Sequence, residues 1–292
     1  MSPPRVTAVV LNWCGEEGTA ACLRSLLAGD YPALTILLAD NGSPDGSGPR
    51  LHAAFPEIAY LQTGANLGYT GGNNAGIRWA LEGGAEQVLV LNNDTVVEPA
   101  AVTHLVEAAA SGARVGAVSP KILHYDAPDR IWFGGGVMSR IRGLGVHERR
   151  GEHDIPIANE PVRDITFATG CCCLFSGDAL RAVGGFAEDF FAYVEDVELS
   201  LRLSRAGYRL LYQPAARVLH RVPLHEGAAP TPFRILHRDR NRRRLVRRHF
   251  GWRDRLVFAA WFYPSRLVTL ARYVGSGDWE RAGALLRGMT EP

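Results

Sequence analysis

The sequence of 292 residues predicts an α/β protein, in which a mostly parallel sheet is flanked by helices and followed by a helical C-terminal extension. Over residues 6–120, short apolar runs alternate with helical patterns, as in strands joined by crossover helices. Several of these runs end in Asn, Asp or His, which is typical of strands that deliver side chains to a ligand crevice. Toward the C-terminus the chain becomes rich in arginine.

The composition indicates a soluble globular protein, because 47% of the residues are hydrophobic and 21% are charged. The N-terminus lacks the long apolar region of a signal peptide, and no run approaches the roughly 18 apolar residues that a membrane helix needs. Three of the five cysteines are consecutive, Cys171 to Cys173, and none has the spacing of a zinc site. We therefore expect reduced thiols and a cytoplasmic protein.

The first strands are predicted at residues 6–11, 34–39 and 58–61. The first strand ends in Asn12 and the second in Asp40, and two acids open the helix between them, where they complement the helix dipole. One polar side chain after one strand is ordinary turn chemistry. Repeated at several strand ends of one sheet, this pattern favours a shared ligand crevice.

A glycine-rich segment at residues 64–76, GANLGYTGGNNAG, contains five glycines and three asparagines. It lacks the G-x-G-x-x-G pattern of a dinucleotide site and the terminal Gly-Lys-Ser/Thr of a phosphate loop. By itself the segment is equally consistent with a tight loop and with the start of a helix, which we predict to continue over residues 77–81.

The central strand is predicted in VLVLNNDTVV, residues 88–97, where a continuous apolar run meets Asn92, Asn93 and Asp94. These side chains would lie in the crevice past the end of the strand. Asp94 is a hard oxygen donor that suits Mg²⁺ or Mn²⁺ carrying a phosphorylated ligand. The alternative is a simple turn before the helix expected at residues 99–110.

The second half is predicted to combine hairpins with further strands and helices, and its last strand ends at His220. Its elements are expected as a strand at residues 115–119, hairpins over 131–145, a mobile loop at 155–162, a buried strand at 166–175, helices at 178–183 and 194–206, strands at 208–212 and 217–219, and a linker at 223–232.

The stretch FFAYVEDVELSL, residues 190–201, places Glu195, Asp196 and Glu198 in the first turns of a predicted helix. Three acids at this position could simply complement the helix dipole. Aromatic residues precede them, so the carboxylates emerge from apolar surroundings. One carboxylate beside a metal–phosphate site could accept a proton from an incoming hydroxyl.

Seven segments, in order along the chain, resemble a family-2 inverting glycosyltransferase of the GT-A fold, most closely its bacterial rhamnosyltransferase-type members. They are VVLNW (9–13), CLRSLL (22–27), DYPALTILLADNGSPDGS (30–47), NLGYTGGNNAGI (66–77), VLVLNNDT (88–95), VGGFAEDFFAYVEDVELSLRLSRAGY (183–208) and residues 212–220. The resemblance implies a Rossmann-like glycosyltransferase domain at residues 1–222. Within it, residues 1–120 would bind the nucleotide-sugar and residues 121–222 the acceptor. Residues 223–292 would form a linker and an Arg-rich helical extension.

The resemblance also implies an activity. A sugar would move from a pyrimidine nucleotide-sugar, a UDP- or dTDP-sugar such as dTDP-rhamnose, to a hydroxyl of a glycan or lipid-linked acceptor. A divalent cation, Mn²⁺ or Mg²⁺, would stabilise the leaving diphosphate. A single displacement inverts the anomeric carbon and needs no second, nucleophilic carboxylate.

Site roles follow from the resemblance by position. Asp40 resembles the carboxylate that binds the pyrimidine base, and Asp196, paired with Glu195, resembles the catalytic base. His220 resembles a second metal ligand beside Asp94, and its alternative is a strand-end cap. The metal-binding Asp-x-Asp motif is matched with Asn92 in place of the first Asp, which removes one charge from the metal site. Nucleotide and donor-sugar contacts are implied for Asn12, Asn41, Asn66, Gly68, Asn73, Asn74, Asn92 and Asn93.

Three other functions were weighed against this one. A sugar-phosphate nucleotidyltransferase would carry basic residues in its first glycine-rich loop, where VVLNWCGEEG has acids. A catalytically inactive nucleotide-sugar-binding protein would not need Glu195, Asp196 and Asp94. Nucleic-acid binding would rest only on the arginine-rich tail, which contains no recognisable motif.

The tail at residues 233–255 holds ten Arg and two Asp. On a helix, Arg243, Arg244, Arg247 and Arg248 fall on one arc, which would rest on an anionic surface at the inner face of the cell membrane. Arg238 and Arg242 fall in the apolar arc and would face the donor diphosphate or an acceptor phosphate. The alternative is an ordinary surface helix. Acceptor contacts are further expected at Trp132, within residues 131–160.

Overall fold

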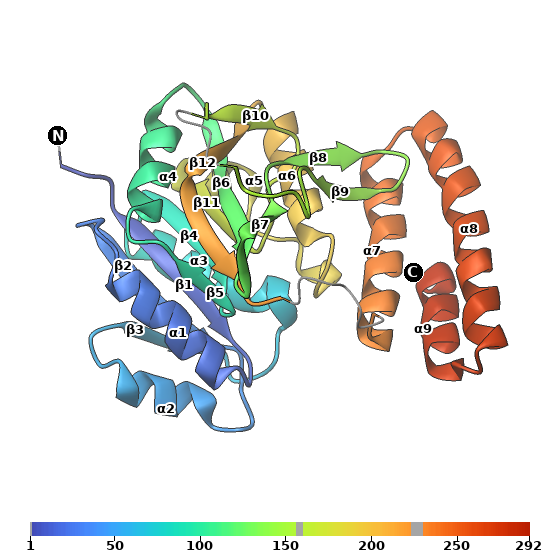
Figure 1. Ribbon diagram of the computed structural model, residues 1–292, viewed down its shortest axis with the longest axis horizontal. Helices are drawn as coiled ribbons and strands as arrows, with labels where there is room; N and C mark the ends of the chain where they lie inside the picture. The colour runs from blue at the N-terminus through green and yellow to red at the C-terminus, as the bar shows by residue number, and fades with distance from the viewer. Residues whose placement is uncertain (1, 156–159, 223–229) are drawn as a thin grey trace.

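The computed structural model describes residues 2–155, 160–222 and 230–292, and shows a central sheet between helices with three C-terminal helices beside it (Figure 1). Ten strands form the sheet in the order β10-β12-β6-β11-β4-β1-β2-β3, with β5 paired to β12 and β7 paired to β6. The predicted α/β fold and the helical extension are therefore confirmed.

The N-terminal half is a parallel unit with crossover helices. Its strands are β1 (Val6–Asn12), β2 (Leu34–Asp40), β3 (Ala59–Gln62) and β4 (Gln87–Asn92), and its helices are α1 (Glu16–Leu27), α2 (Ser47–Ala54) and α3 (Gly68–Glu82). β1 pairs with β2 on one side and with β4 on the other. Because the chain winds from β1 out to β3 and then returns to β4, the strand order reverses between β1 and β4. Such a switch point opens a crevice at the carboxyl ends of the strands.

The helix α3 begins at Gly68, so the glycine-rich segment is the start of a helix, one of the two predicted alternatives, and its glycines serve packing. A Cβ atom on Gly72 would lie 2.5 Å from Leu11 Cδ1, and one on Gly76 would lie 2.3 Å from Val9 Cγ1. The missing side chains let the helix backbone approach β1 closely. Val9 and Leu11 alternate with Asn12 along the strand, so α3 covers the face of β1 opposite to the side chain of Asn12.

The second half extends the sheet and adds a separate hairpin. Its strands are β5 (Thr95–Val97), β6 (Val115–His124), β7 (Ala127–Phe133), β8 (Gly136–Ser139), β9 (Leu144–His147), β10 (Arg163–Ile165), β11 (Cys172–Ser176) and β12 (Arg209–His220), and its helices are α4 (Ala101–Ala110), α5 (Gly177–Val183), the 3-10 turn η1 (Glu188–Phe190) and α6 (Glu195–Arg205). β8 and β9 form the predicted hairpin.

Several predicted strands were wrong in extent. The strand expected at residues 115–119 continues to His124 as β6. The strand expected at residues 166–175 begins only at Cys172, because the backbone of Ala168 and Gly170 donates to side chains of α6 instead of to the sheet. The strands expected at residues 208–212 and 217–219 are one strand, β12, with a register shift between Gln213 and Arg217. This irregularity accommodates Pro214, which cannot donate to a ladder.

The short strand β5 determines which strand ends meet. β4 and β12 are separated in the sheet by β11 and β6. β5 follows β4 directly and pairs antiparallel with the end of β12, with Thr95 opposite His220. The carboxyl end of β12 is thereby brought to the carboxyl end of β4.

The extension consists of α7 (Pro232–His249), α8 (Trp252–Gly275) and α9 (Trp279–Thr290). Thr231 caps α7 by accepting a hydrogen bond from Arg234 N, and Pro232 occupies the first turn, where no N–H is needed. Leu245 of α7 joins the main core of the domain. Two small cores hold the three helices together, one around Phe258 and Phe262 and one around Ile235 and Leu285.

Parts of two predictions lie outside the described residues, namely residues 156–159 of the predicted loop and 223–229 of the predicted linker. All five cysteines are described, and all are free thiols, four of them buried, in agreement with the prediction. Within the described ranges, no helix has both the length and the apolar character that crossing a bilayer requires.

Candidate active site

A cavity of about 1190 Å³ lies at the carboxyl ends of β1 and β4, with walls from α6 and α7. Most of the predicted site residues line it, namely Asn41, Asn66, Gly68, Asn92, Asn93, Asp94, Trp132, Glu195, Asp196, His220 and Arg238. The remaining ones, Asn12, Asp40, Asn73, Asn74 and Arg242, do not line it.

Asp94 and His220 meet on one wall of the cavity, where His220 Nε2 lies 3.1 Å from Asp94 Oδ1. Asp94 Oδ1 and His220 Nδ1 are buried, and neither forms a hydrogen bond with any described residue. Trp132 packs edge-on against the imidazole, with 4.6 Å between ring centroids, and so restrains its orientation. A buried carboxylate oxygen without a hydrogen bond beside an imidazole fits a pair of ligands for a divalent cation.

This pair supplies two of the ligands that a divalent cation would need. No three His, Cys, Asp or Glu side chains within the described residues form a group that could hold a metal ion. Asn93, the middle residue of the motif, turns toward the fold and donates its side-chain amide to Thr19 Oγ1 at 2.8 Å.

Glu195 and Asp196 open α6 and also line the cavity, and both carboxyls are buried. Asp196 accepts hydrogen bonds from Gly170 N at 3.1 Å and from Val197 N at 2.8 Å, which hold the carboxylate in place. Burial outweighs these bonds and raises the pKa of Asp196 to about 6. Burial and the charge of Asp196 raise the pKa of Glu195 well above its ordinary range. Burial and mutual repulsion therefore favour a state in which the two carboxyls share one proton.

The loop that leads to these acids has an unusual backbone. Phe191, Tyr193 and Val194 have φ angles of 60°, 69° and 74°, in the left-handed region that non-glycine residues rarely adopt. Asn241 of α7 is fully buried beneath this loop. Its side-chain amide nitrogen lies 2.7, 2.8 and 2.9 Å from the carbonyl oxygens of Phe190, Ala192 and Tyr193. One amide group of the extension thus holds the loop that positions the acids.

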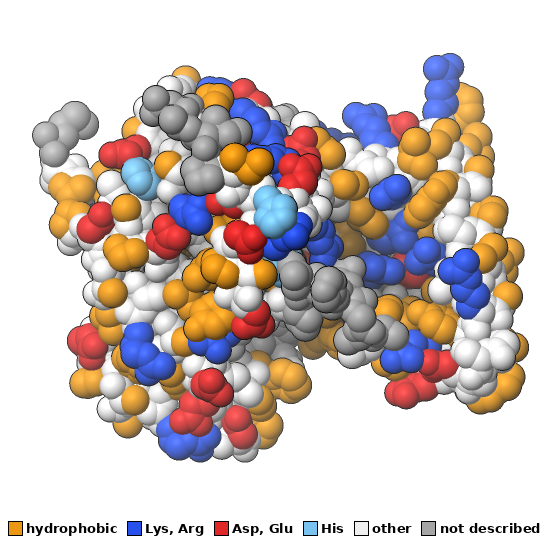
Figure 2. All heavy atoms as spheres, viewed as in Figure 1, with side chains coloured by type: hydrophobic (Ala, Val, Ile, Leu, Met, Phe, Trp, Pro, Cys, Tyr) orange, Lys and Arg blue, Asp and Glu red, His pale blue; other side chains and the backbone are white. Residues whose placement is uncertain are grey.

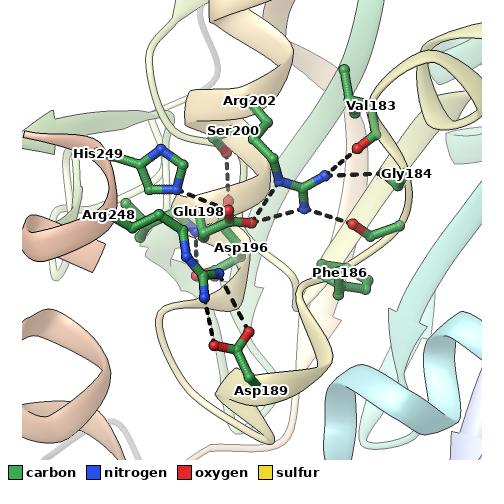
Figure 3. Close-up of polar contacts among 12 residues, drawn as sticks. Val183, Gly184, Phe186, Asp189, Asp196, Glu198, Ser200, Arg202, Arg248 and His249 are labelled. Atoms are coloured by element: carbon green, nitrogen blue, oxygen red, sulfur yellow. Dashed lines mark hydrogen bonds and ion pairs between the residues drawn. The ribbon is translucent and has the colours of Figure 1, made fainter. Parts of the chain in front are cut away.

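The third acid of the stretch, Glu198, is directed away from the cavity and joins α6 to the end of α7 (Figure 3). Its carboxylate lies 2.8 Å from Arg202 and 2.9 Å from His249 Nε2. Burial disfavours the charged form, but the hydrogen bond to His249 and the charge of Arg202 outweigh burial and lower the pKa of Glu198. Figure 3 also shows Arg248 reaching Asp189, at 2.6 Å. Glu198 therefore has a structural role.

Asn12 and Asp40 lie behind the cavity wall, with no exposed surface, rather than in the cavity. Asn12 Nδ2 donates to Asp40, Ser43 and Ser47, and Asp40 also accepts from Ser43 and Gln62. Side chains after two neighbouring strands satisfy one another here. A nucleotide could therefore contact Asp40 only by displacing Ser43 or Gln62, and the predicted contact stays a prediction.

The asparagines of the glycine-rich segment divide into two groups. Asn41 donates to Asn66 Oδ1 and Gly68 O, both at 3.1 Å, and so shapes the loop that lines the cavity. Asn73 and Asn74 are buried inside α3, which corrects their predicted contact with the donor sugar. Asn74 donates to the carbonyl oxygen of Phe186 and accepts from its backbone N–H, both at 2.8 Å. These two bonds anchor the segment that precedes η1.

The extension contributes one wall of the cavity, with Phe233, Arg234 and Arg238 of α7 opposite Arg142 and Arg150. Arg242 is wrong as a phosphate ligand. It is buried, pairs with Asp239 at 3.0 Å, donates to Arg142 O, and packs against the rings of Trp261 and Phe262.

Three of the four residues in the arginine arc predicted to face a membrane pack against the protein instead, and the fourth, Arg247, is exposed. Arg248 and Arg244 pair with Asp189 of η1. Arg243 donates to the carbonyl oxygens of Gly288 and Glu291 at the end of α9.

Sequence reasoning missed several residues of the site. Gly170 and Tyr69 were not singled out, although Gly170 N binds Asp196 and Tyr69 Oη binds Gly170 O at 2.6 Å. Asn241 was also missed. The sequence marks it in one way: Asn241 is the single uncharged residue in the run RDRNRRR, residues 238–244.

Comparison with known proteins agrees with this geometry. The family model described as "Glycosyl transferase family 2" matches residues 8–184. A relative from Mycobacterium tuberculosis named N-acetylglucosaminyl-diphospho-decaprenol L-rhamnosyltransferase is 34% identical over 79% of this chain and 80% of its own length. The low-salt glycan biosynthesis hexosyltransferase Agl10 of Haloferax volcanii is 25% identical over 81% of this chain and 74% of its own.

Solved structures show a similar fold. GalNAc-T7 with UDP, GalNAc and Mn²⁺ superposes with a TM-score of 0.65 at 14% identity, over 84% of this chain, which spans 48% of that chain. The mannosyltransferase PcManGT from Pyrobaculum calidifontis, with GDP-Man and Mn²⁺, has a TM-score of 0.59 at 17% identity, over 99% of this chain and 86% of its own. The match to the family model and to the rhamnosyltransferase relative disfavours the nucleotidyltransferase alternative. The chain belongs to glycosyl transferase family 2 and is a glycosyltransferase with a GT-A-like fold.

Proposed function

We propose that this enzyme moves a sugar from a UDP- or dTDP-sugar to a hydroxyl of a lipid-linked glycan acceptor, with inversion at the anomeric carbon. The observation that carries the proposal is the buried acid pair of α6, which faces the same cavity as Asp94 and His220. A cavity lined by both a proton acceptor and a pair of cation ligands suits a single displacement.

Asp196 is the base in this proposal. It removes the proton of the acceptor hydroxyl while the hydroxyl oxygen bonds to the anomeric carbon, and the bond from that carbon to the diphosphate oxygen breaks. A carboxylate with a pKa of about 6 is ionised near neutral pH and basic enough to share the proton in the transition state. Glu195, held protonated, would donate a hydrogen bond to a sugar hydroxyl without repelling Asp196.

Asp94 and His220 would hold a divalent cation, with the remaining positions left to diphosphate oxygens and water. The cation would supply positive charge next to the leaving diphosphate. An imidazole ligand favours Mn²⁺ over Mg²⁺. With Asn92 uncharged, the chain supplies one carboxylate to the cation, and we expect affinity for the cation to depend on the bound nucleotide.

The acceptor would bind on the side of α7. The cavity lining there includes the apolar ring of Phe233 and four arginines, Arg142, Arg150, Arg234 and Arg238. Guanidinium groups beside an aromatic ring suit an acceptor in which a diphosphate joins a sugar to a lipid. The named acceptor of the Mycobacterium tuberculosis relative has this chemistry.

A transfer assay tests the proposal. Purified protein is incubated with Mn²⁺, with dTDP-rhamnose, UDP-sugars or GDP-mannose in turn, and with a GlcNAc-diphospho-polyprenol of short chain. We expect one pyrimidine donor to give a disaccharide product whose anomeric configuration, read by NMR, is opposite to that of the donor. A product of retained configuration would exclude single displacement, and donor binding without transfer or hydrolysis would indicate an inactive binding protein.

A further inference from the structure

The outer face of α8 is a long apolar surface. Its exposed side chains are Trp252, Leu256, Val257, Tyr263, Leu267, Val268 and Val274, each between 40% and 66% exposed. At 1.5 Å per residue, the stretch from Trp252 to Val274 is about 33 Å long. Hydrophobic side chains gather along the outer edge of the C-terminal helices in Figure 2.

This surface is separate from the packing face of the same helix. At 100° per residue, all seven side chains fall within one arc of about 160°. Phe258 and Phe262 fall on the other side, where they are buried in the small core between the helices of the extension. The outer apolar residues are therefore not needed to hold the extension together.

Charge is distributed unevenly around this surface. The helix contains four Arg and a single Asp, and within the apolar arc the only charged side chain is Arg253. Arg255 and Arg272 lie at its two edges and are exposed. The single acid, Asp254, pairs with Arg140 at 2.9 Å. The surface is thus apolar with a positively charged margin.

We propose that this outer face of α8 lies on the surface of an anionic lipid bilayer. Helices that lie in the interface plane combine a broad apolar face with basic residues at its edges. Trp252 and Tyr263 supply rings with an apolar body and a polar tip, which suit the level of the lipid headgroups. The positive margin complements the negative surface of such a bilayer.

This assignment replaces the arginine arc of α7, in which three of the four members are occupied by Asp189 and by the end of α9. It goes beyond the proposed transfer reaction and is testable without it. A bilayer contact at α8 would also suit the reaction, because α7, which continues into α8 through Phe250 and Gly251, carries Phe233 and Arg238 into the cavity.

A second copy of the chain is the competing occupant of the same face. A symmetric dimer through α8 would place the two positive margins against each other, which disfavours it. The experiment therefore measures oligomeric state and vesicle binding on the same samples.

The test is flotation of the full-length protein with vesicles of phosphatidylcholine alone or with 30% phosphatidylglycerol (a content of about this size gives a clearly negative surface). We expect the wild type to float with the anionic vesicles at low salt and to bind them at least about ten-fold more weakly in high salt, where charges are screened. Leu256→Glu with Leu267→Glu should lower the partition coefficient at least about ten-fold, because both side chains would leave the apolar phase.

Two variants serve as controls. Leu27→Glu places the same change on an exposed leucine of α1, 41% exposed, and should bind vesicles as the wild type does. Arg253→Gln with Arg272→Gln should weaken binding to anionic vesicles and leave binding to neutral vesicles unchanged. Melting temperature and the thermal shift with nucleotide show that each variant is folded.

The proposal is overturned if the wild type stays in solution with anionic vesicles at low salt, or if the double glutamate variant binds as tightly as the wild type. It is also overturned if light scattering shows a wild-type dimer that the glutamate variant makes monomeric. Failure of the transfer assay alone leaves this result untouched, because flotation requires no donor and no acceptor.

Discussion

The side-chain amide of Asn241 donates to the carbonyl oxygen of Tyr193 at 2.9 Å, and this contact ties the C-terminal extension to the loop that presents Glu195 and Asp196. The same nitrogen also serves the carbonyls of Phe190 and Ala192. Because it bonds three carbonyls of a loop with left-handed residues, this one group compensates for backbone strain at the acid pair.

Asn241→Asp therefore should lower kcat more than it lowers donor affinity. An aspartate keeps the shape but turns an oxygen toward three carbonyl oxygens, which repel it. We expect kcat to fall by about 10- to 100-fold as the acids shift from their productive position, with the donor KM within about two-fold. Steady-state kinetics with separate donor and acceptor titrations measure the two effects.

Arg248→Gln is the matched control for Asn241, since it breaks a half-exposed ion pair between the same helix and η1. Exposed ion pairs contribute little, so kcat should stay within about two-fold. If Asn241→Asp lowers only the melting temperature and leaves kcat unchanged, the residue stabilises the fold without positioning the acids.

Asp196 should determine the acidic limb of the pH profile. Burial raises its pKa to about 6, so the carboxylate gains a proton and loses basicity as the pH falls through about 6. We expect kcat/KM to fall about ten-fold per pH unit below this value. Asp196→Asn should lower kcat by about 100-fold or more at pH 7.5 and abolish this limb. An acidic limb that survives in the variant would assign the base to another group.

The raised pKa of Asp196 predicts that stability changes with pH in the direction opposite to activity. The folded-state pKa of about 6 lies above the ordinary value of 3.8, so the folded state favours the protonated acid. This contribution is fully present below pH 3.8 and is lost as the pH rises through about 6. Asp196→Asn should therefore flatten the melting temperature between pH 4 and 7 relative to the wild type.

Asp94→Ala should abolish transfer, because no other acid in VLVLNNDT can take its place. His220→Ala should weaken activity less, since it removes an uncharged ligand. In titrations with Mn²⁺ and Mg²⁺ in the presence of nucleotide, both variants should need a higher metal concentration for half-maximal binding than the wild type. Full wild-type activity in excess chelator would contradict the cation site.

The base of the donor provides a separate test. We expect UDP and dTDP to raise the melting temperature more than GDP or ADP. A base that reaches Asp40 must displace Gln62 or Ser43, because both side chains bind its carboxylate. Asp40→Asn should lower stability even without ligand, since Asn12 and Ser43 both donate to this residue. Equal shifts with all four nucleotides would exclude pyrimidine recognition.

Arg238 should matter for acceptors that carry a phosphate. Arg238→Gln should raise KM for a diphospholipid acceptor by about ten-fold and leave KM for a phosphate-free sugar acceptor unchanged. Arg240→Gln is the matched control, because Arg240 lies on the same helix but does not line the cavity. Equal effects of Arg238→Gln on both acceptors would exclude a phosphate contact.

Sequence reasoning located the strands and the acids correctly where the evidence was local. The apolar run before Asn92 and the aromatic lead-in to Glu195 reflect burial that begins within the segment itself. Arg242 shows where such reasoning fails. Its place in the apolar arc was read correctly, but its partners, Asp239 and two aromatic rings from α8, depend on how three helices pack.

The sequence by itself determined the α/β alternation, the strands that end in polar residues and the family, because apolar periodicity and ordered motifs are properties of short segments. Only the tertiary structure decided which polar ends share a cavity. β5 joins Asp94 to His220 across the sheet, while Asn12 and Asp40 satisfy each other beneath it. Sheet order and helix packing make these choices, since they set distances between residues that are far apart in the chain.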